Sequence, residues 1–180
     1  MEPLKKTNFN QKRSARKSSR HSKVSGQFGE IFVAYMLSKF GFEVAQVDHT
    51  GLDILAVSRN GKKRLGVSVK NRTRDKEGSN WTVNFPHGDL ERLKKACHIF
   101  SAEPFVAVVV DRPNDSIDDS MWLTMWLMPL PTAKRKCTTY KNGILAFAVT
   151  QAREMHYRTL PDVNWVSLKS DSLNLNKLRG

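Results

Sequence analysis

The apolar positions of residues 26–40 follow a helical rather than an alternating pattern. Nearly every position in this stretch after Gln27 is apolar or small, which predicts a helix that is buried on most of its sides. Ser25 is a suitable N-cap residue, and Gly41 is expected to end the helix. The acidic residue Glu30 falls in the first half of this predicted helix.

Three extended segments follow, at residues 42–47, 52–58 and 64–70. Each alternates or runs apolar with β-branched residues, as strands do. The turn Asn60-Gly61 between the second and third segments is a strong hairpin signal, because both residues tolerate positive φ. The sequence therefore predicts a helix followed by an antiparallel meander of three strands.

The second half of the chain adds further helices and strands. Asp89 is expected to cap a helix that carries Leu90, Leu93, Cys97 and Phe100 at helical spacing. The continuous β-branched run 105–110 is typical of a buried central strand. Further strands are predicted at 81–85, 122–130 and 144–149, with a short helix and a strand at Trp165-Val166 within 150–168. This order predicts an α/β fold with a mixed central sheet flanked by helices.

The charge of the chain is strongly positive and unevenly distributed. Over 180 residues with 39% apolar content, which suffices for one domain, the formal net charge is +13. Residues 1–24 hold eight Lys and Arg against one Glu, about half of the excess. We expect a disordered basic arm at 1–24, a folded domain at 25–168 and a polar tail at 169–180. The net charge favours a polyanionic partner such as nucleic acid, although the arm alone is also compatible with a solvated tail.

Other classes of protein are disfavoured by the sequence. The longest apolar runs are far shorter than a membrane span, and the N-terminus lacks a secretory apolar core. Cys97 and Cys137 are isolated and fit neither a zinc site nor a disulfide framework. These features predict a cytoplasmic protein, associated with the nucleoid if prokaryotic, with no membrane partner.

One carboxylate and one lysine stand out as candidates for chemistry. Asp53 lies near the start of the second predicted strand, and Lys70 ends the third, so the hairpin brings them onto neighbouring strands. Phosphodiester hydrolysis needs a hard cation with oxygen ligands, which Asp53 can supply, and a positive group that orients water or stabilises the anionic transition state, which suits Lys70. The simpler alternative is an ordinary cross-strand ion pair between the two.

The ordered set of motifs resembles the PD-(D/E)XK nuclease superfamily, in its archaeal Holliday-junction resolvase-like and restriction-endonuclease-like branch. The resemblance rests on Gly29-Glu30, then Gly51-Leu52-Asp53-Ile54, then a hairpin and Val67-Ser68-Val69-Lys70. It covers residues 26–110. It implies a restriction-endonuclease-like core and a divalent-metal-dependent endonuclease that hydrolyses DNA with Mg²⁺ or Mn²⁺.

The resemblance also implies roles for single residues. The catalytic group would comprise Glu30, Asp53, Ser68 and Lys70, with the metal held by Asp53, Glu30 and the backbone carbonyl of Val69. Ser68 departs from the family, which usually has Glu or Gln there, so a second carboxylate is missing. Either Glu30 or Asp48 compensates and cleavage is retained, or the chain is a non-catalytic nucleic-acid-binding module on a degenerate nuclease fold.

Several cationic residues are candidates for contacts to the DNA backbone. They are Arg13, Arg16, Lys17, Arg20, His49, Arg72 and Arg74. Arg72 and Arg74 are equally compatible with solvated loop charges, and the alternative for His49 is an ordinary histidine of a surface turn. The alternative for the residues of the arm is a solvated tail. The resemblance also implies that the protein could act as a homodimer, so that it reaches two DNA strands. The apolar strand 122–130 is the candidate dimer interface. A third function, as a basic structural component of a nucleoprotein particle, rests on charge alone.

Overall fold

The computed structural model describes residues 18–73, 81–113 and 121–170. The helices and strands follow one another in the predicted order, with an additional helix at Leu130–Lys136 and an additional strand at Cys137–Thr139 that the sequence did not predict. In chain order they are α1 (His21–Lys39), β1 (Phe42–His49), β2 (Leu52–Ser58), β3 (Arg64–Thr73), β4 (Thr82–Phe85), α2 (Asp89–Ile99), β5 (Glu103–Pro113), β6 (Met121–Pro129), α3 (Leu130–Lys136), β7 (Cys137–Thr139), β8 (Leu145–Ala148), α4 (Gln151–Arg158) and β9 (Asn164–Ser170).

A six-stranded mixed sheet forms the centre of the molecule. Its strand order is β1-β2-β3-β5-β6-β9, and β3 and β5 run parallel whereas the other neighbours are antiparallel. The Asn60-Gly61 turn joins β2 to β3 as an antiparallel hairpin, which confirms that prediction. The predicted α/β class with a mixed central sheet flanked by helices is confirmed, and the arrangement is consistent with a restriction-endonuclease-like core.

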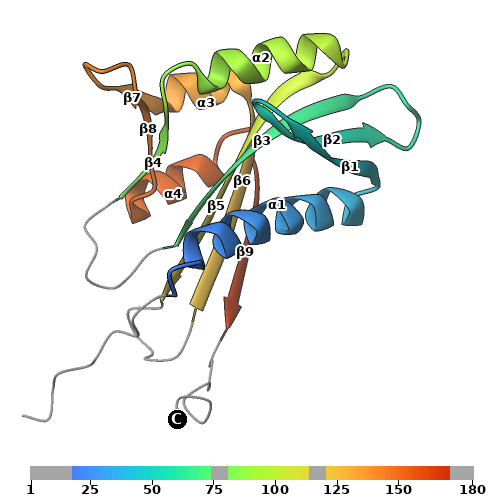
Figure 1. Ribbon diagram of the computed structural model, residues 1–180. Coiled ribbons are helices and arrows are strands. Elements are labelled where there is room, and N and C mark those ends of the chain that lie inside the picture. Colours follow the sequence, from blue (N-terminus) through green and yellow to red (C-terminus); the bar gives the residue numbers. More distant parts are fainter. Residues whose placement is uncertain (1–17, 74–80, 114–120, 171–180) are drawn as a thin grey trace, which may run out of the picture.

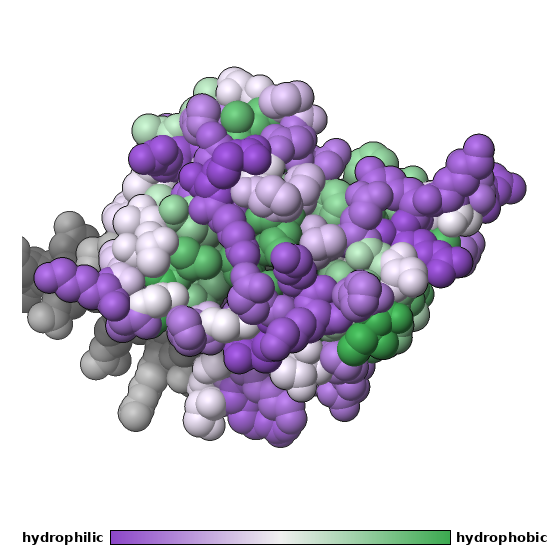
Figure 2. Space-filling model, turned by 90° about the horizontal axis from the view of Figure 1, so that it is seen from above, coloured by the Kyte–Doolittle hydropathy of each residue, from purple (hydrophilic) through white to green (hydrophobic). Residues whose placement is uncertain are grey.

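Two hydrophobic cores lie on the two faces of the large sheet. On one face, α1 covers a core that includes Val33 and Leu37. On the other face, α2, α3 and α4 pack with a second, three-stranded sheet of order β4-β8-β7 around Trp126, Phe147 and Tyr157. Figure 1 shows α1 and α2 on opposite sides of the strands. Seen from the side of α2, the surface is mostly hydrophilic (Figure 2).

Helix α1 differs from its prediction in its start and in its burial. It begins at His21, so Ser25 lies inside the helix instead of capping it. Only one face is buried, and the opposite face exposes Phe28, Ile31 and Tyr35 by 42%, 59% and 58%. The prediction of a helix buried on most sides is therefore wrong, because a helix over one sheet face has only one apolar layer to contact. None of the helices within the described ranges is long and apolar enough to cross a bilayer.

Strand β6 is an inner strand, which removes the candidate dimer interface at 122–130. It is hydrogen-bonded to β5 on one side and to β9 on the other. Its side chains from Leu123 to Met128 are buried in the cores of this one chain, with Trp126 fully inaccessible. The apolar character of this strand thus reflects core packing.

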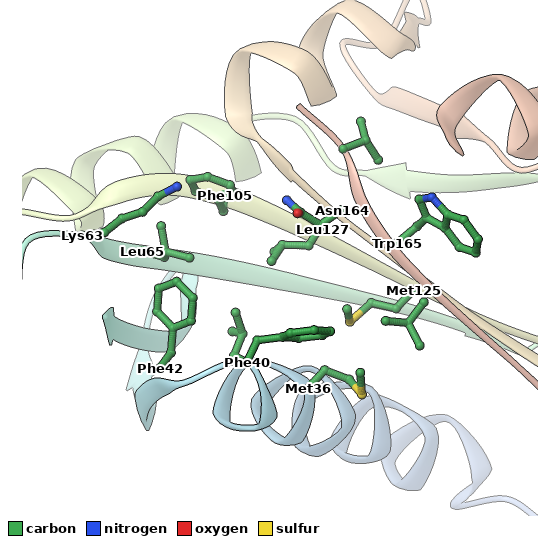
Figure 3. Close-up of a pocket in the computed structure, with 13 residues that line it drawn as sticks. Met36, Phe40, Phe42, Lys63, Leu65, Phe105, Met125, Leu127, Asn164 and Trp165 are labelled. Atoms are coloured by element: carbon green, nitrogen blue, oxygen red, sulfur yellow. The ribbon is translucent and has the colours of Figure 1, made fainter. Parts of the chain in front are cut away.

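An apolar groove lies on the α1 face, far from the residues expected to carry chemistry. It has a volume of about 460 Å³ and is lined by the C-terminal end of α1, by the first residues of β3 and β5, and by β6 and β9, with Phe40, Leu65 and Trp165 among its lining residues (Figure 3). Because Lys70 lies toward the other end of β3, this groove is separate from the candidate active site.

Candidate active site

Asp53 is held in place by the backbone of the neighbouring strand. It follows the first residue of β2, just beyond the paired residues Ile54 and Val67. Its Oδ2 accepts a hydrogen bond of 2.6 Å from the backbone N–H of Val69. Hydrogen bonds to an ionised acceptor are short and strong, so this contact fixes the carboxylate beside β3. A carboxylate offers about four acceptor positions, which leaves capacity for a further ligand.

Val69 lies in a peptide that is fixed from both sides. Asp53 binds its N–H from the side of β2, and β5 pairs with it in parallel from the other side, where Val69 lies opposite Ala107. The family resemblance implies that its carbonyl binds a metal ion. That role stays a prediction, which a rigid peptide at this position supports.

Glu30 lies close enough to Asp53 for the two charges to interact. Burial, and then the negative charge of Asp53, raise the pKa of Glu30 above its usual value of 4.5. The acids of α1 and β2 are thus electrostatically coupled, and their joint role as metal ligands stays a prediction. Two carboxylates at one position repel each other unless a cation lies between them.

A close approach of α1 to β3 sets the position of Glu30. The preceding residue is Gly29, and a Cβ atom there would lie 2.7 Å from the Cβ of Asn71. Any larger side chain would push the helix away from the strand. Glycine is therefore needed at the first position of the Gly29-Glu30 pair, because it lets the backbone that carries Glu30 lie directly against β3.

Hydrogen bonds fasten the same part of α1 to the strand. Asn71 Nδ2 donates to the backbone oxygen of Ser25 at 2.5 Å and to its Oγ at 2.7 Å. Ser25 Oγ lies 3.0 Å from Thr73 Oγ1. Sequence reasoning missed Asn71 as a positioning residue and misread Ser25 as a cap. The signal available was only that Asn71 directly follows Lys70.

Lys70 forms its ion pair with Asp89 rather than with Asp53. Its Nζ lies 2.8 Å from Asp89 Oδ2, at the first residue of α2, and the side chains are 30% and 14% exposed. Asp89 also binds Arg92, one turn further along the helix. The alternative of an ordinary Asp53–Lys70 ion pair is therefore wrong for the described structure. Asp89 was expected only to cap α2, a position that Gly88 takes instead.

Ser68 and Lys70 lie on the α2 face of β3. Gly66, two residues before Ser68, contacts Cys97 of α2, and Lys70 reaches Asp89, whereas Asn71 reaches α1. This alternation is the strand period of two. Ser68 is buried, with 7% of its surface exposed, and adds a neutral hydroxyl but no charge.

The donors at this place suit a hard divalent cation with few acidic ligands. Glu30 and Asp53 supply carboxylate oxygens, and Val69 a peptide oxygen, which are the atoms that Mg²⁺ and Mn²⁺ prefer. The raised pKa of Glu30 shows that the two acids share one electrostatic environment. Among the described residues, no group of three or more His, Cys, Asp and Glu could hold a metal ion, so a cation here would depend on two carboxylates and neutral oxygens. Asp48, the other proposed compensating acid, is exposed on β1.

The candidate DNA contacts divide into three groups. Arg13, Arg16, Lys17 and Arg74 lie outside the described residues. Arg20 at the start of α1 and Arg72 on β3 are exposed. The His49 ring packs edge-to-face on Phe100 with 5.7 Å between ring centroids, so at least one of its contacts is structural.

The two cysteines are free thiols that do not belong to the site. Burial raises the pKa of Cys97 to about 11 and that of Cys137 to about 12. Both groups are therefore protonated near pH 7 and are poor nucleophiles.

Comparison with known proteins adds a structural likeness. No family model matches the sequence, and no curated protein matches it. The structure is similar to Hjc, a Holliday junction resolvase from the archaeal hyperthermophile Archaeoglobus fulgidus, with a TM-score of 0.48 and 19% sequence identity over 68% of this chain and 83% of that chain. The motifs of this sequence likewise resemble archaeal Holliday-junction resolvases.

Proposed function

We propose that this protein is a divalent-metal-dependent nuclease that hydrolyses phosphodiester bonds of DNA. The observation that carries the proposal is the convergence of Glu30 and Asp53 beside the strand that bears Lys70. The excess of positive charge, +13 over the whole chain, supports a polyanionic substrate.

Each residue has a distinct role in this proposal. Glu30 and Asp53 hold the cation, together with the carbonyl of Val69. When bound, the cation neutralises charge on the phosphate oxygens and lowers the pKa of a water molecule. The Lys70 ammonium lies on the adjacent strand, where it stabilises the negative charge that develops on the phosphate. Asp89 fixes the direction of Lys70 through the 2.8 Å ion pair.

A non-catalytic nucleic-acid-binding module on the same fold is the second candidate. Two observations favour it. Ser68 on β3 is neutral and does not supply the site with a carboxylate at the position where the family usually has Glu or Gln. The ammonium of Lys70 is already paired with Asp89. Both would weaken a cation site and the use of Lys70 in catalysis.

A cleavage assay distinguishes the two candidates. We expect the protein to nick or cut at least one member of a panel of duplex, single-stranded and branched DNA in Mg²⁺ or Mn²⁺, and to do neither in EDTA. Asp53→Asn and Glu30→Gln should each lower the rate by about a hundredfold or more, because each removes a charged metal ligand.

Glu43→Gln is the matched control, since Glu43 is an exposed acid on β1 outside the site. It should cut at the rate of the unchanged protein. Thermal unfolding with and without Mg²⁺ separates metal binding from cleavage, because a cation that binds only the folded protein raises the melting temperature. Cleavage that survives Asp53→Asn would exclude this site, and stabilisation by metal without cleavage would favour the second candidate.

A further inference from the structure

Residues 130–158 form a segment in which cations greatly outnumber acids. This segment, which we call the basic unit, comprises α3, β7, β8 and α4. It contains six Lys and Arg and one acid, Glu154. Glu154 is 3% exposed, whereas four of the six cations are exposed and the other two, Lys136 and Arg158, are half-buried. Such segregation of charge, rather than net charge alone, is the footprint of a surface that binds a polyanion.

Two of the cations hold the basic unit against its neighbours. Lys134 Nζ lies 2.5 Å from Glu91 Oε1 of α2, and Arg135 Nη2 lies 3.3 Å from Asp162 Oδ2. Lys141 and Arg153 differ from these, since within the described part of the chain no carboxylate lies at ion-pair distance from either. Both are exposed and available to phosphates.

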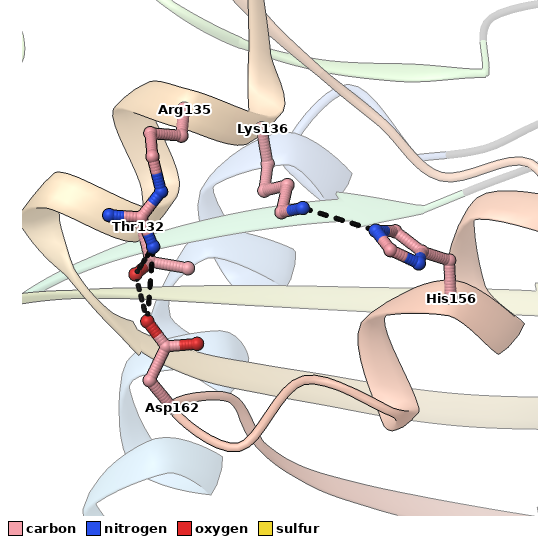
Figure 4. Close-up of polar contacts among 5 residues, drawn as sticks. All are labelled: Thr132, Arg135, Lys136, His156 and Asp162. Carbon is pink, nitrogen blue, oxygen red and sulfur yellow. Dashed lines mark hydrogen bonds and ion pairs between the residues drawn. The ribbon is translucent and has the colours of Figure 1, made fainter.

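Polar contacts also join the helices of the basic unit. Lys136 Nζ of α3 lies 3.1 Å from His156 Nε2 of α4 (Figure 4). Arg135 Nη2 donates to Thr132 Oγ1 at 2.8 Å, and Thr132 Oγ1 donates to Asp162. The first contact joins α3 to α4, and the others join α3 to the segment between α4 and β9. The surface cations are therefore carried on a positioned framework.

The turn between β7 and β8 places the basic unit next to the candidate active site. A Cβ atom on Gly143 of this turn would lie 2.6 Å from Nδ1 of His87. His87 comes two residues before Asp89, whose carboxylate holds Lys70. The β7–β8 turn thus contacts the loop before α2, and Asp89, at the end of that loop, forms the ion pair with Lys70.

An exposed aromatic ring lies near each end of β8. Tyr140 begins the β7–β8 turn, where its backbone N–H donates to Ile144 at 2.9 Å, and its side chain is 47% exposed. Trp81, whose backbone oxygen accepts from Val149 at 2.7 Å, is 45% exposed at the other end. Exposed aromatic rings combined with cations are the means by which proteins bind single strands, because every base can stack.

We propose that the basic unit is a nucleic-acid-binding surface that holds a single-stranded segment of DNA beside the candidate active site. Lys141 and Arg153 contact phosphates, and Tyr140 stacks on an unpaired base. Only the assignment of this strand as a substrate rests on the proposed function; the binding surface itself does not.

Binding without cleavage tests this surface. The probe is a fluorescently labelled single-stranded DNA of about 20 nucleotides, titrated in EDTA at several NaCl concentrations. Replacing Lys141 and Arg153 together by Ala should weaken binding and reduce the magnitude of the slope of log K against log salt by about 1.4, since each phosphate contact on a single strand contributes about 0.7.

The matched control changes the same charge elsewhere. Arg59 and Lys62 are exposed cations in the β2–β3 turn, at the far end of β3 from Lys70. Their double replacement by Ala should leave the slope nearly unchanged. Equal losses in both double variants would mean that only net charge matters, and no loss in either would mean that the basic unit does not touch DNA. Both results overturn the proposal.

Substitutions of Tyr140 test base stacking separately from the effect of charge. Tyr140→Ala should weaken single-strand binding about fivefold to a hundredfold, whereas Tyr140→Phe keeps the ring and the affinity. A fully paired duplex of the same sequence should show little difference between the two variants. Equal single-strand affinity for Ala and Phe would overturn the stacking assignment. Because EDTA removes metal chemistry, Asp53→Asn should bind normally here even though it fails in the cleavage assay.

Discussion

Glu30 is placed where folding makes its ionised form unfavourable. Burial, and then the charge of Asp53, raise its pKa, so Glu30 is protonated more easily in the folded protein than in the unfolded chain. A bound cation would offset the unfavourable negative charge of Glu30.

The pH dependence of stability checks this placement. A carboxyl with a raised pKa in the folded state contributes stability that is fully present below its unfolded pKa, near 4.5, and is lost as pH rises through the higher folded pKa. In metal-free protein, Glu30→Gln should therefore increase the free energy of unfolding at pH 7 relative to the unchanged protein, and this advantage should vanish below pH 4.5. Urea unfolding across this range measures both, with Glu43→Gln as the exposed control. A variant that is less stable at pH 7 would contradict the assignment.

Asp89 acts on the proposed chemistry through Lys70. We expect Asp89→Asn to lower kcat about tenfold to a hundredfold with little change in KM, because a displaced ammonium weakens transition-state stabilisation more than substrate binding. Asp89→Glu should restore part of the rate. Glu43→Gln, which changes an exposed acid on β1 outside the site, is the control. A purely structural role would leave kcat unchanged or would move melting temperature and rate together.

Among the elements, α1 has a buried face and an exposed face that contribute differently to the free energy of unfolding. Leu37 is 4% exposed and packs in the core below the helix, whereas Ile31 is 59% exposed. Leu37→Ala should lower the free energy of unfolding by about 2–5 kcal/mol, because it leaves a cavity. Ile31→Ala should change it by less than about 0.5 kcal/mol. Denaturant unfolding of the two variants provides the comparison, and a large loss for Ile31→Ala would show that its face is covered.

The meander could be predicted from sequence because its signals are local. The Asn60-Gly61 turn, the alternation of β1 and β2, and Gly41 after the first helix each act within a few residues. By contrast, α3 and β7 were missed, because the apolar run of β6 continues into Leu130 and hides the helix start. A proline within the first turn was the available signal.

Part of the candidate site could not be predicted, because it depends on contacts between distant segments. Asp53 and Lys70 lie on adjacent strands of one hairpin, which the sequence shows. The pairing of Lys70 with Asp89 depends on how α2 returns to the sheet, and the contact of Ser25 with Asn71 depends on how closely Gly29 lets α1 approach. Neither packing distance is encoded in a local pattern.

At the scale of the whole molecule, the parallel pairing of β3 with β5 requires a long crossover, and this crossover contains α2 and its Asp89. The β2–β3 hairpin closes through a short turn, whereas Leu65 must find Glu103, 38 residues further along the chain. Closing the longer loop costs roughly 1.5 kcal/mol more chain entropy, and nonlocal pairing slows folding. The site residues from Glu30 to Lys70 all lie before this crossover, and Asp89 at the start of α2 lies within it. The crossover that makes β3 and β5 parallel is therefore also the segment that supplies Lys70 with its carboxylate partner.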